Sequence, residues 1–347
     1  MSDLTTILSA TGTRDREGEQ VSRNNRRKKQ RADQTRRAQQ RYPALDLESP
    51  EVVAARTALT RLIPSRRRIE DRANEARKFE EWRVNPSYPE PGSPNAVDDN
   101  DAAFPESIIK HVSKAPLQDH ALFPAMAAAE NLTTVVRLID DWDRNGKVRT
   151  LSVITLCRAA LESSSRTVWL LSPTSPTERH ERALRMTKAE VLGQKRYLAK
   201  QVNAYKDSTN TSYLETVTAD LKRATKVIDD LDEISGAPTN EQFIEQASAW
   251  VDETAINPQH SPMADMARPM YSIASGLAHG YTWTTKHMRG AGDLFSITAD
   301  FLYASTSMLS AAVILWETQA AATENIGDRC PPHLRAVARD FHARYAN

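Results

Sequence analysis

Long apolar segments with helical periodicity and few glycines most restrict the fold of this chain. Such segments cover residues 121–143, 147–171, 177–206, 211–233 and 293–324, and shorter ones lie near 240–250, 263–286 and 332–345. Only 11 of the 347 residues are glycine, which is few for a sheet with many tight turns. No alternating strand pattern or hairpin dipeptide occurs that would favour strands over helices. We therefore predict an all-α fold, a bundle of long helices joined by short loops.

Capping residues mark several of the expected helix starts. Ser175-Pro176-Thr177-Glu178 and Thr239-Asn240-Glu241-Gln242 both have the pattern of a capping box. Ser49 precedes Pro50, a residue favoured in the first helical turn. We expect one helix to begin there and a second helical segment over 66–83.

The most apolar run, Phe301–Trp316, is too short to cross a bilayer. It has 16 residues, four of them Ser or Thr, whereas a membrane span needs about 20 mostly apolar residues. We expect a buried core helix here and no membrane span.

Charge divides the chain into segments. Residues 21–42 carry nine Lys or Arg and one acid, a net +8, so that the remainder carries −7. Residues 85–105 contain five prolines, four acids and no basic residue, a composition typical of a linker. We therefore expect a disordered or helical basic arm over 1–42, an arginine-rich helical segment over 43–84, an acidic linker over 85–105 and a helical bundle over 106–347.

The basic arm indicates a polyphosphate partner. Clustered cations bind nucleic acid by releasing counterions, and this needs no folded core. The alternative roles for the arm are docking on the acidic remainder or on another protein, and binding to an anionic membrane surface. We expect contact with nucleic acid or a ribonucleoprotein through the cations of the arm: Arg23, Arg26, Arg27, Lys28, Lys29, Arg31, Arg36, Arg37 and Arg41.

Several classes of site are absent from the sequence. Two cysteines, Cys157 and Cys330, cannot build a disulfide framework or a four-thiolate zinc site. No nucleotide-binding loop, dinucleotide fingerprint or metalloprotease motif occurs. We expect no metal and no cofactor, and a reducing cytoplasm as the compartment. A homodimer of the bundle is compatible with the sequence.

Two polar stripes occur in otherwise apolar helical segments. Arg158, Glu162 and Arg166 form the first, and the second consists of Tyr271, Ser275 and His279. Four-residue spacing keeps three residues within about 80° of one helix face.

Each stripe has two interpretations. The first is either a solvated face with weak ion pairs or a half-buried polar line. The second is either a set of core residues with satisfied polar groups or, if the two helices face each other, part of an acid/base site acting on a phosphodiester.

The paired segments "CRAALESSSRTVWLL" and "YSIASGLAHG" resemble a loose set of bacterial all-helical proteins that are distantly similar to HEPN domains. The resemblance covers residues 120–320 and implies a compact helical bundle. Many HEPN domains are metal-independent ribonucleases of toxin and phage-defence systems, with an arginine four to six residues before a histidine. This chain departs from that hallmark, because the nearest arginine before His279 is Arg268.

Two functions therefore follow from the sequence. The preferred one is a non-enzymatic helical protein that contacts nucleic acid or a ribonucleoprotein through its arm. The alternative is a divergent HEPN-like ribonuclease, in which His279 is the acid/base, Arg158 and Arg166 steady the phosphate charge, and Glu162 orients an arginine. Tyr271 and Ser275 would position the substrate.

Overall fold

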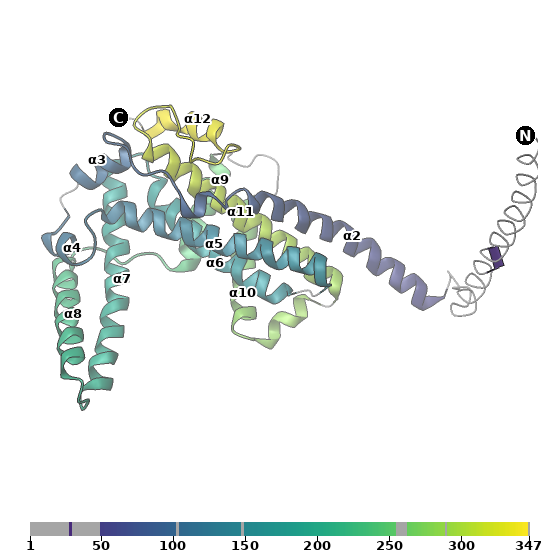
Figure 1. The fold of residues 1–347 in the computed structure, drawn as a ribbon, viewed down its shortest axis with the longest axis horizontal. Coiled ribbons are helices and arrows are strands. Elements are labelled where there is room, and N and C mark those ends of the chain that lie inside the picture. The colour runs from purple at the N-terminus through teal and green to yellow at the C-terminus, as the bar shows by residue number, and fades with distance from the viewer. Residues whose placement is uncertain are drawn as a thin grey trace, which may run out of the picture. The chain divides into compact units, whose positions relative to one another are not determined.

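The computed structural model describes residues 28–29, 49–101, 104–146, 149–254, 262–288 and 290–345. The chain divides into two compact units, residues 1–60 and 61–347. Every regular element in the described ranges is a helix (Figure 1). The all-α prediction is thereby confirmed.

Eleven α-helices and two short 3₁₀ helices follow one another in the described residues. They are α2 (Pro50–Arg77), η1 (Trp82–Val84), α3 (Pro94–Asp101), α4 (Glu106–His111), α5 (Pro116–Asn145), α6 (Thr150–Leu171), α7 (Pro176–Tyr205), α8 (Thr211–Asp230), α9 (Asn240–Glu253), α10 (Met263–Ala278), η2 (Thr282–His287), α11 (Ala291–Ala320) and α12 (Arg335–Tyr345). The long helices match the periodic segments of the sequence to within a few residues, whereas α3 and α4 were not predicted.

Helix α2 begins where the sequence placed a start, in the first unit. The Ser49 hydroxyl accepts a hydrogen bond from the Val52 amide at 3.3 Å. One continuous helix runs to Arg77 with Pro64 inside it, so the expectation of two separate helical segments was wrong. An interior proline costs about 3 kcal/mol or more. Burial of Ile69, Ala73 and the other apolar residues that follow offsets this cost.

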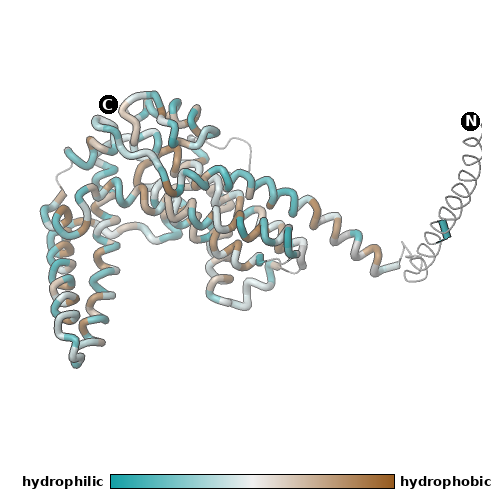
Figure 2. The backbone as a smooth tube through the Cα atoms, viewed as in Figure 1, coloured by the Kyte–Doolittle hydropathy of each residue, from teal (hydrophilic) through white to brown (hydrophobic). Residues whose placement is uncertain are grey.

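Helices α6 and α11 form the centre of the second unit. Helix α6 packs against α5, α9, α10 and α11, and Trp169, Phe301 and Trp316 are almost completely buried around them. Figure 2 shows apolar and polar residues alternating along most of the helices, as amphipathic segments require.

Two helical stretches are long and apolar enough to cross a membrane by length and composition, Pro116–Trp142 and Gly292–Ala320. In the second, 78% of the most apolar window is buried inside the protein. Phe301–Trp316 lies within it, so this run is the buried core helix that the sequence predicted.

The arginines of α2 in the second unit bind carboxylates of the bundle. Arg68 donates to Asp300 of α11 at 2.9 Å. Arg77 forms a bidentate pair with Asp140 of α5, at 2.9 and 3.0 Å. The charges of this arginine-rich segment thus join α2 to two helices of the bundle.

The segment 85–101 carries more structure than a linker requires. Glu90 accepts a hydrogen bond from the Ala322 amide at 2.9 Å. Asp98 is buried against α7, and Asp99 binds the first turn of α5. Three of its acidic residues therefore hold the segment against other parts of the second unit.

Two predicted capping boxes had different outcomes. At α9, Thr239 accepts from the Gln242 amide and the Gln242 side chain accepts from the Thr239 amide, so this box is complete. At α7 the helix starts at Pro176 as predicted, but no side-chain capping bond to Ser175 forms among the described residues. Glu178 instead pairs with Arg182, 2.6 Å away.

Helix α10 ends earlier than the sequence predicted. Gly280 adopts a φ of 70°, and the Tyr281 amide donates to the Gly276 carbonyl at 2.8 Å. Together with the bond from the Gly280 amide to Leu277, this is a Schellman termination. The periodicity of 263–286 therefore joined two helices, α10 and η2, that this turn separates.

Candidate functional site

The first polar stripe is a half-buried line on α6. Arg158 Nε lies 2.7 Å from Glu162 Oε1, and their side chains are only 18% and 20% exposed. Neighbouring Cys157 and Leu161 are fully buried. This pair fits the half-buried line better than the solvated face, because a solvated pair would leave both charges in water.

The two stripes meet at one point. The Arg158 guanidinium lies over the Tyr271 ring, 5.3 Å from its centroid. Since α10 packs against α6, the phenol shields the Arg158–Glu162 pair from one side. A cation over an aromatic face is stabilised by about 0.5–2 kcal/mol.

Arg166 belongs to a different environment. It lies over the Phe243 ring of α9, 5.6 Å from the centroid, and donates to Asn240 Oδ1 at 3.1 Å. Arg158 therefore faces α10 while Arg166 faces α9. The two guanidinium groups are not brought together on one phosphate-sized site.

Ser275 and His279 occupy the last turn of α10. The Ser275 carbonyl accepts from the His279 amide at 3.1 Å. His279 is the C-cap residue, is exposed, and its ring lies 5.8 Å from that of Tyr281. Throughout the described ranges, no hydrogen bond or ion pair joins its ring to the stripe on α6. The acid/base arrangement considered from the sequence thus lacks its central contact.

A polar cluster between α5 and α7 was missed by sequence reasoning. His120 is buried; its Nε2 lies 2.7 Å from Thr187 Oγ1, and its Nδ1 lies 3.5 Å from Glu190 Oε1. The Thr187 hydroxyl can donate to the Ala183 carbonyl, at 2.9 Å, which leaves its oxygen to accept from His120. The two ring nitrogens thus contact oxygen atoms of two residues of α7, which fixes the imidazole between α5 and α7.

Glu190 has a lowered pKa in this cluster. Burial acts to raise the pKa, but the hydrogen bond and charge of His120, with the charge of Arg166, outweigh it. The ionised carboxylate is therefore favoured beside His120. No sequence signal reveals the cluster, because its members come from helices about seventy residues apart.

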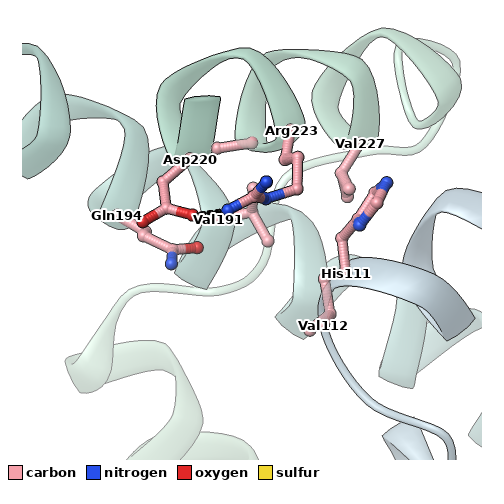
Figure 3. Close-up of a pocket in the computed structure, with 8 residues that line it drawn as sticks. His111, Val112, Val191, Gln194, Asp220, Arg223 and Val227 are labelled. Carbon is pink, nitrogen blue, oxygen red and sulfur yellow. Dashed lines mark hydrogen bonds and ion pairs between the residues drawn. The ribbon is translucent and has the colours of Figure 1, made fainter. Parts of the chain in front are cut away.

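A small hollow lies between α4, α7 and α8. Its volume is about 30 Å³. Figure 3 shows His111 facing α8, with Asp220 and Arg223 paired on the other side and Gln194 beside them. Since Asp220 neutralises Arg223, the hollow offers no strong anion site.

Cysteine and metal chemistry receive no support. Burial raises the pKa of Cys157 and of Cys330 to about 12, so neither thiol ionises readily near neutral pH. Within the ranges that the structure describes, no cluster of three or more metal-binding side chains occurs.

Most of the predicted nucleic-acid-binding residues lie outside the described residues. Lys28 and Lys29 are described, and both are helical and exposed. The predicted contacts outside the described ranges are Arg23, Arg26, Arg27, Arg31, Arg36, Arg37 and Arg41.

Comparison with known proteins does not assign the chain to a family. No protein-family model, curated protein or solved structure matches it.

Proposed function

We propose that this protein binds nucleic acid, free or within a ribonucleoprotein, through the basic arm at residues 21–42, and that it catalyses no reaction in doing so. The observation that carries the proposal is charge segregation: nine cations and one acid in that segment, against −7 in the remainder. Lys28 and Lys29 expose their side chains, as phosphate contacts require.

Counterion release explains how such an arm binds. Each phosphate that a cation neutralises frees a condensed ion, so affinity falls as salt rises, with a slope of about −0.9 per contact on duplex DNA and about −0.7 on single strands. Eight net charges are enough for affinity that depends strongly on salt. Binding of this kind reads charge rather than sequence.

Pairing within the bundle makes three of its carboxylates poorer docking points for the arm. An arm that bound these carboxylates would first have to displace the arginines that hold them. The pairs concerned are Arg68–Asp300, Arg77–Asp140 and Arg83–Glu130.

The ribonuclease alternative has weaker support. It needs His279 beside a guanidinium group, and the nearest described ring to His279 is that of Tyr281. Arg158 is already engaged by Glu162 and Tyr271.

Charge replacement in the full chain tests the proposal. One variant changes all nine cations of the arm to glutamine; its control changes only the arginines to lysine and so keeps the charge. Anisotropy of labelled single-stranded RNA and duplex DNA is measured between about 50 and 200 mM salt. We expect the glutamine variant to lose most of the affinity and of the salt slope, and the lysine variant to retain both. Equal binding by the glutamine variant and the unmodified protein would overturn the proposal.

A further inference from the structure

Helices α7 and α8 form a hairpin that extends from the rest of the second unit (Figure 1). Its outer part exposes three aromatic side chains: Tyr197 is 58% exposed, Tyr205 40% and Tyr213 37%. Exposed apolar side chains that gather in one patch often mark a contact site. The exposed rings of this hairpin are therefore candidates for contact with a partner.

The tyrosines lie along one face of the hairpin. Tyr197, Gln201 and Tyr205 follow each other at four-residue steps on α7, which places them within about 80° of one helix face and about 12 Å from end to end. Tyr213 of α8 joins this stripe: its ring lies 4.9 Å from the Tyr205 ring, edge to face, and its hydroxyl donates to Gln201 at 3.4 Å. We call these four residues the tyrosine stripe.

Cations border the tyrosine stripe. Arg196 and Lys200 are exposed: Lys200 follows Tyr197 by three residues and so lies one helical turn from it, and Arg196 directly precedes Tyr197 in the chain. In the described part of the chain, neither forms an ion pair with a carboxylate. Asp207 and Glu215 lie two residues from Tyr205 and Tyr213, so the positive border belongs to the Tyr197 end of the stripe.

We propose that the tyrosine stripe, with Arg196 and Lys200, is a second nucleic-acid contact that binds unpaired bases. This inference rests on the proposed function and adds a preference to it. Aromatic side chains stack on bases of any sequence, while neighbouring cations hold the phosphates. Duplex bases are already stacked and cannot use the tyrosines. The arm thus supplies affinity for any nucleic acid, and the stripe favours single strands.

A second copy of the chain is a poorer occupant. Two copies packed in parallel through this face would bring Arg196 and Lys200 of each close together, which is unfavourable. A nucleic acid supplies the opposite charge together with flat apolar surfaces for the rings.

The test uses the full chain and two double variants. Tyr197→Ala with Tyr205→Ala removes the rings, and Tyr197→Phe with Tyr205→Phe keeps them. Affinity is measured for unstructured single-stranded RNA and for duplex RNA of the same length. We expect the alanine variant to bind the single strand at least about 5-fold more weakly, with duplex binding unchanged, and the phenylalanine variant to match the unmodified protein.

Controls separate this inference from the proposed function. Phe123→Ala removes another exposed ring, 74% exposed on α5, and should leave the single-strand preference unchanged. If the unmodified protein binds neither RNA, the proposed function fails. If it binds both and the alanine variant keeps the same ratio of affinities, only the tyrosine stripe is refuted. Loss of self-association in the alanine variant, with RNA binding intact, would assign the stripe to a protein interface and overturn the inference.

Discussion

Asp98 and Arg179 form a bidentate ion pair that is completely enclosed by the protein. Arg179 Nε lies 2.6 Å from Asp98 Oδ2 and its Nη2 lies 3.1 Å from Oδ1, with side chains 1% and 0% exposed. The remaining Arg179 nitrogen donates to the carbonyls of Pro173 and Thr174. One residue of the acidic segment thus holds α3, α7 and the end of α6 together.

Removing one partner of this pair should be costly. Asp98→Ala leaves a buried guanidinium without its counter-charge, and we expect unfolding free energy to fall by about 3–5 kcal/mol. Urea denaturation measures this loss of unfolding free energy. Glu178→Ala is the matched control, because it removes a half-exposed carboxylate from the next arginine on α7, Arg182, and should cost less than about 1 kcal/mol. Similar losses in both variants would contradict the argument.

Asp98 and Asp99 also show where prediction from the sequence stops. Periodicity and caps located the long helices, since they depend on neighbours in the chain. The same local logic assigned a proline-rich acidic stretch to a linker. What fixes these carboxylates is contact with Arg179 and with the start of α5, and the sequence does not display such distant partners.

The candidate site shows the same limit of prediction from local sequence patterns. Four-residue spacing put Arg158, Glu162 and Arg166 on one face of α6 but left open whether that face is solvated or half-buried. The contact between Arg158 and Tyr271 joins the two stripes. Gly280 was a readable stop signal that would have put His279 at a helix end. His120 had no signal at all, because Glu190 reaches it from another helix.

Asp99 should make stability depend on pH. Its carboxylate accepts from the Leu117 and Gln118 amides, at 3.0 and 3.1 Å, and so caps α5, whose own N-cap residue is Ala115. Burial raises its pKa to about 6 despite these bonds. Because the folded pKa is raised, the stability from this group is fully present below the usual pKa of about 4 and is lost as pH rises through about 6.

Asp99→Asn removes this titration. Because asparagine matches the protonated acid in charge and size, we expect the variant to show a smaller decline in melting temperature between about pH 4 and 7 than the unmodified protein. Thermal unfolding across that range measures it. Parallel curves for the two proteins would show that Asp99 does not titrate in this window.

Gly276 and Gly193 should respond in opposite directions to alanine. A β-carbon at Gly276 of α10 would lie 2.6 Å from the buried Thr284 methyl and 2.7 Å from the Trp283 ring. At Gly193 of α7 nothing lies within 4 Å. We expect Gly276→Ala to lower the unfolding free energy by about 1–3 kcal/mol through overpacking.

Gly193→Ala is the control for helix propensity. It should raise the unfolding free energy by about 0.5–1 kcal/mol, because alanine is the better helix former and meets no neighbour. Chemical denaturation of both variants gives the comparison. If alanine at position 276 stabilised the protein as well, η2 would have to pack on α10 less closely than the structure has it.

His279 and Arg158 should separate stability from activity. His279 is exposed at the end of α10, so His279→Ala should leave the melting temperature unchanged. Arg158→Ala strands the half-buried Glu162 carboxylate and removes the cation over Tyr271, a loss of about 1–3 kcal/mol. Arg158→Lys keeps the charge but not the planar group over the ring, so its loss of stability should lie between those of the other two variants.

A labelled RNA incubated with each purified protein measures activity as the second readout. We expect no protein-dependent cleavage by any of them; RNA fragments formed by the unmodified protein and missing with His279→Ala would instead establish the ribonuclease alternative.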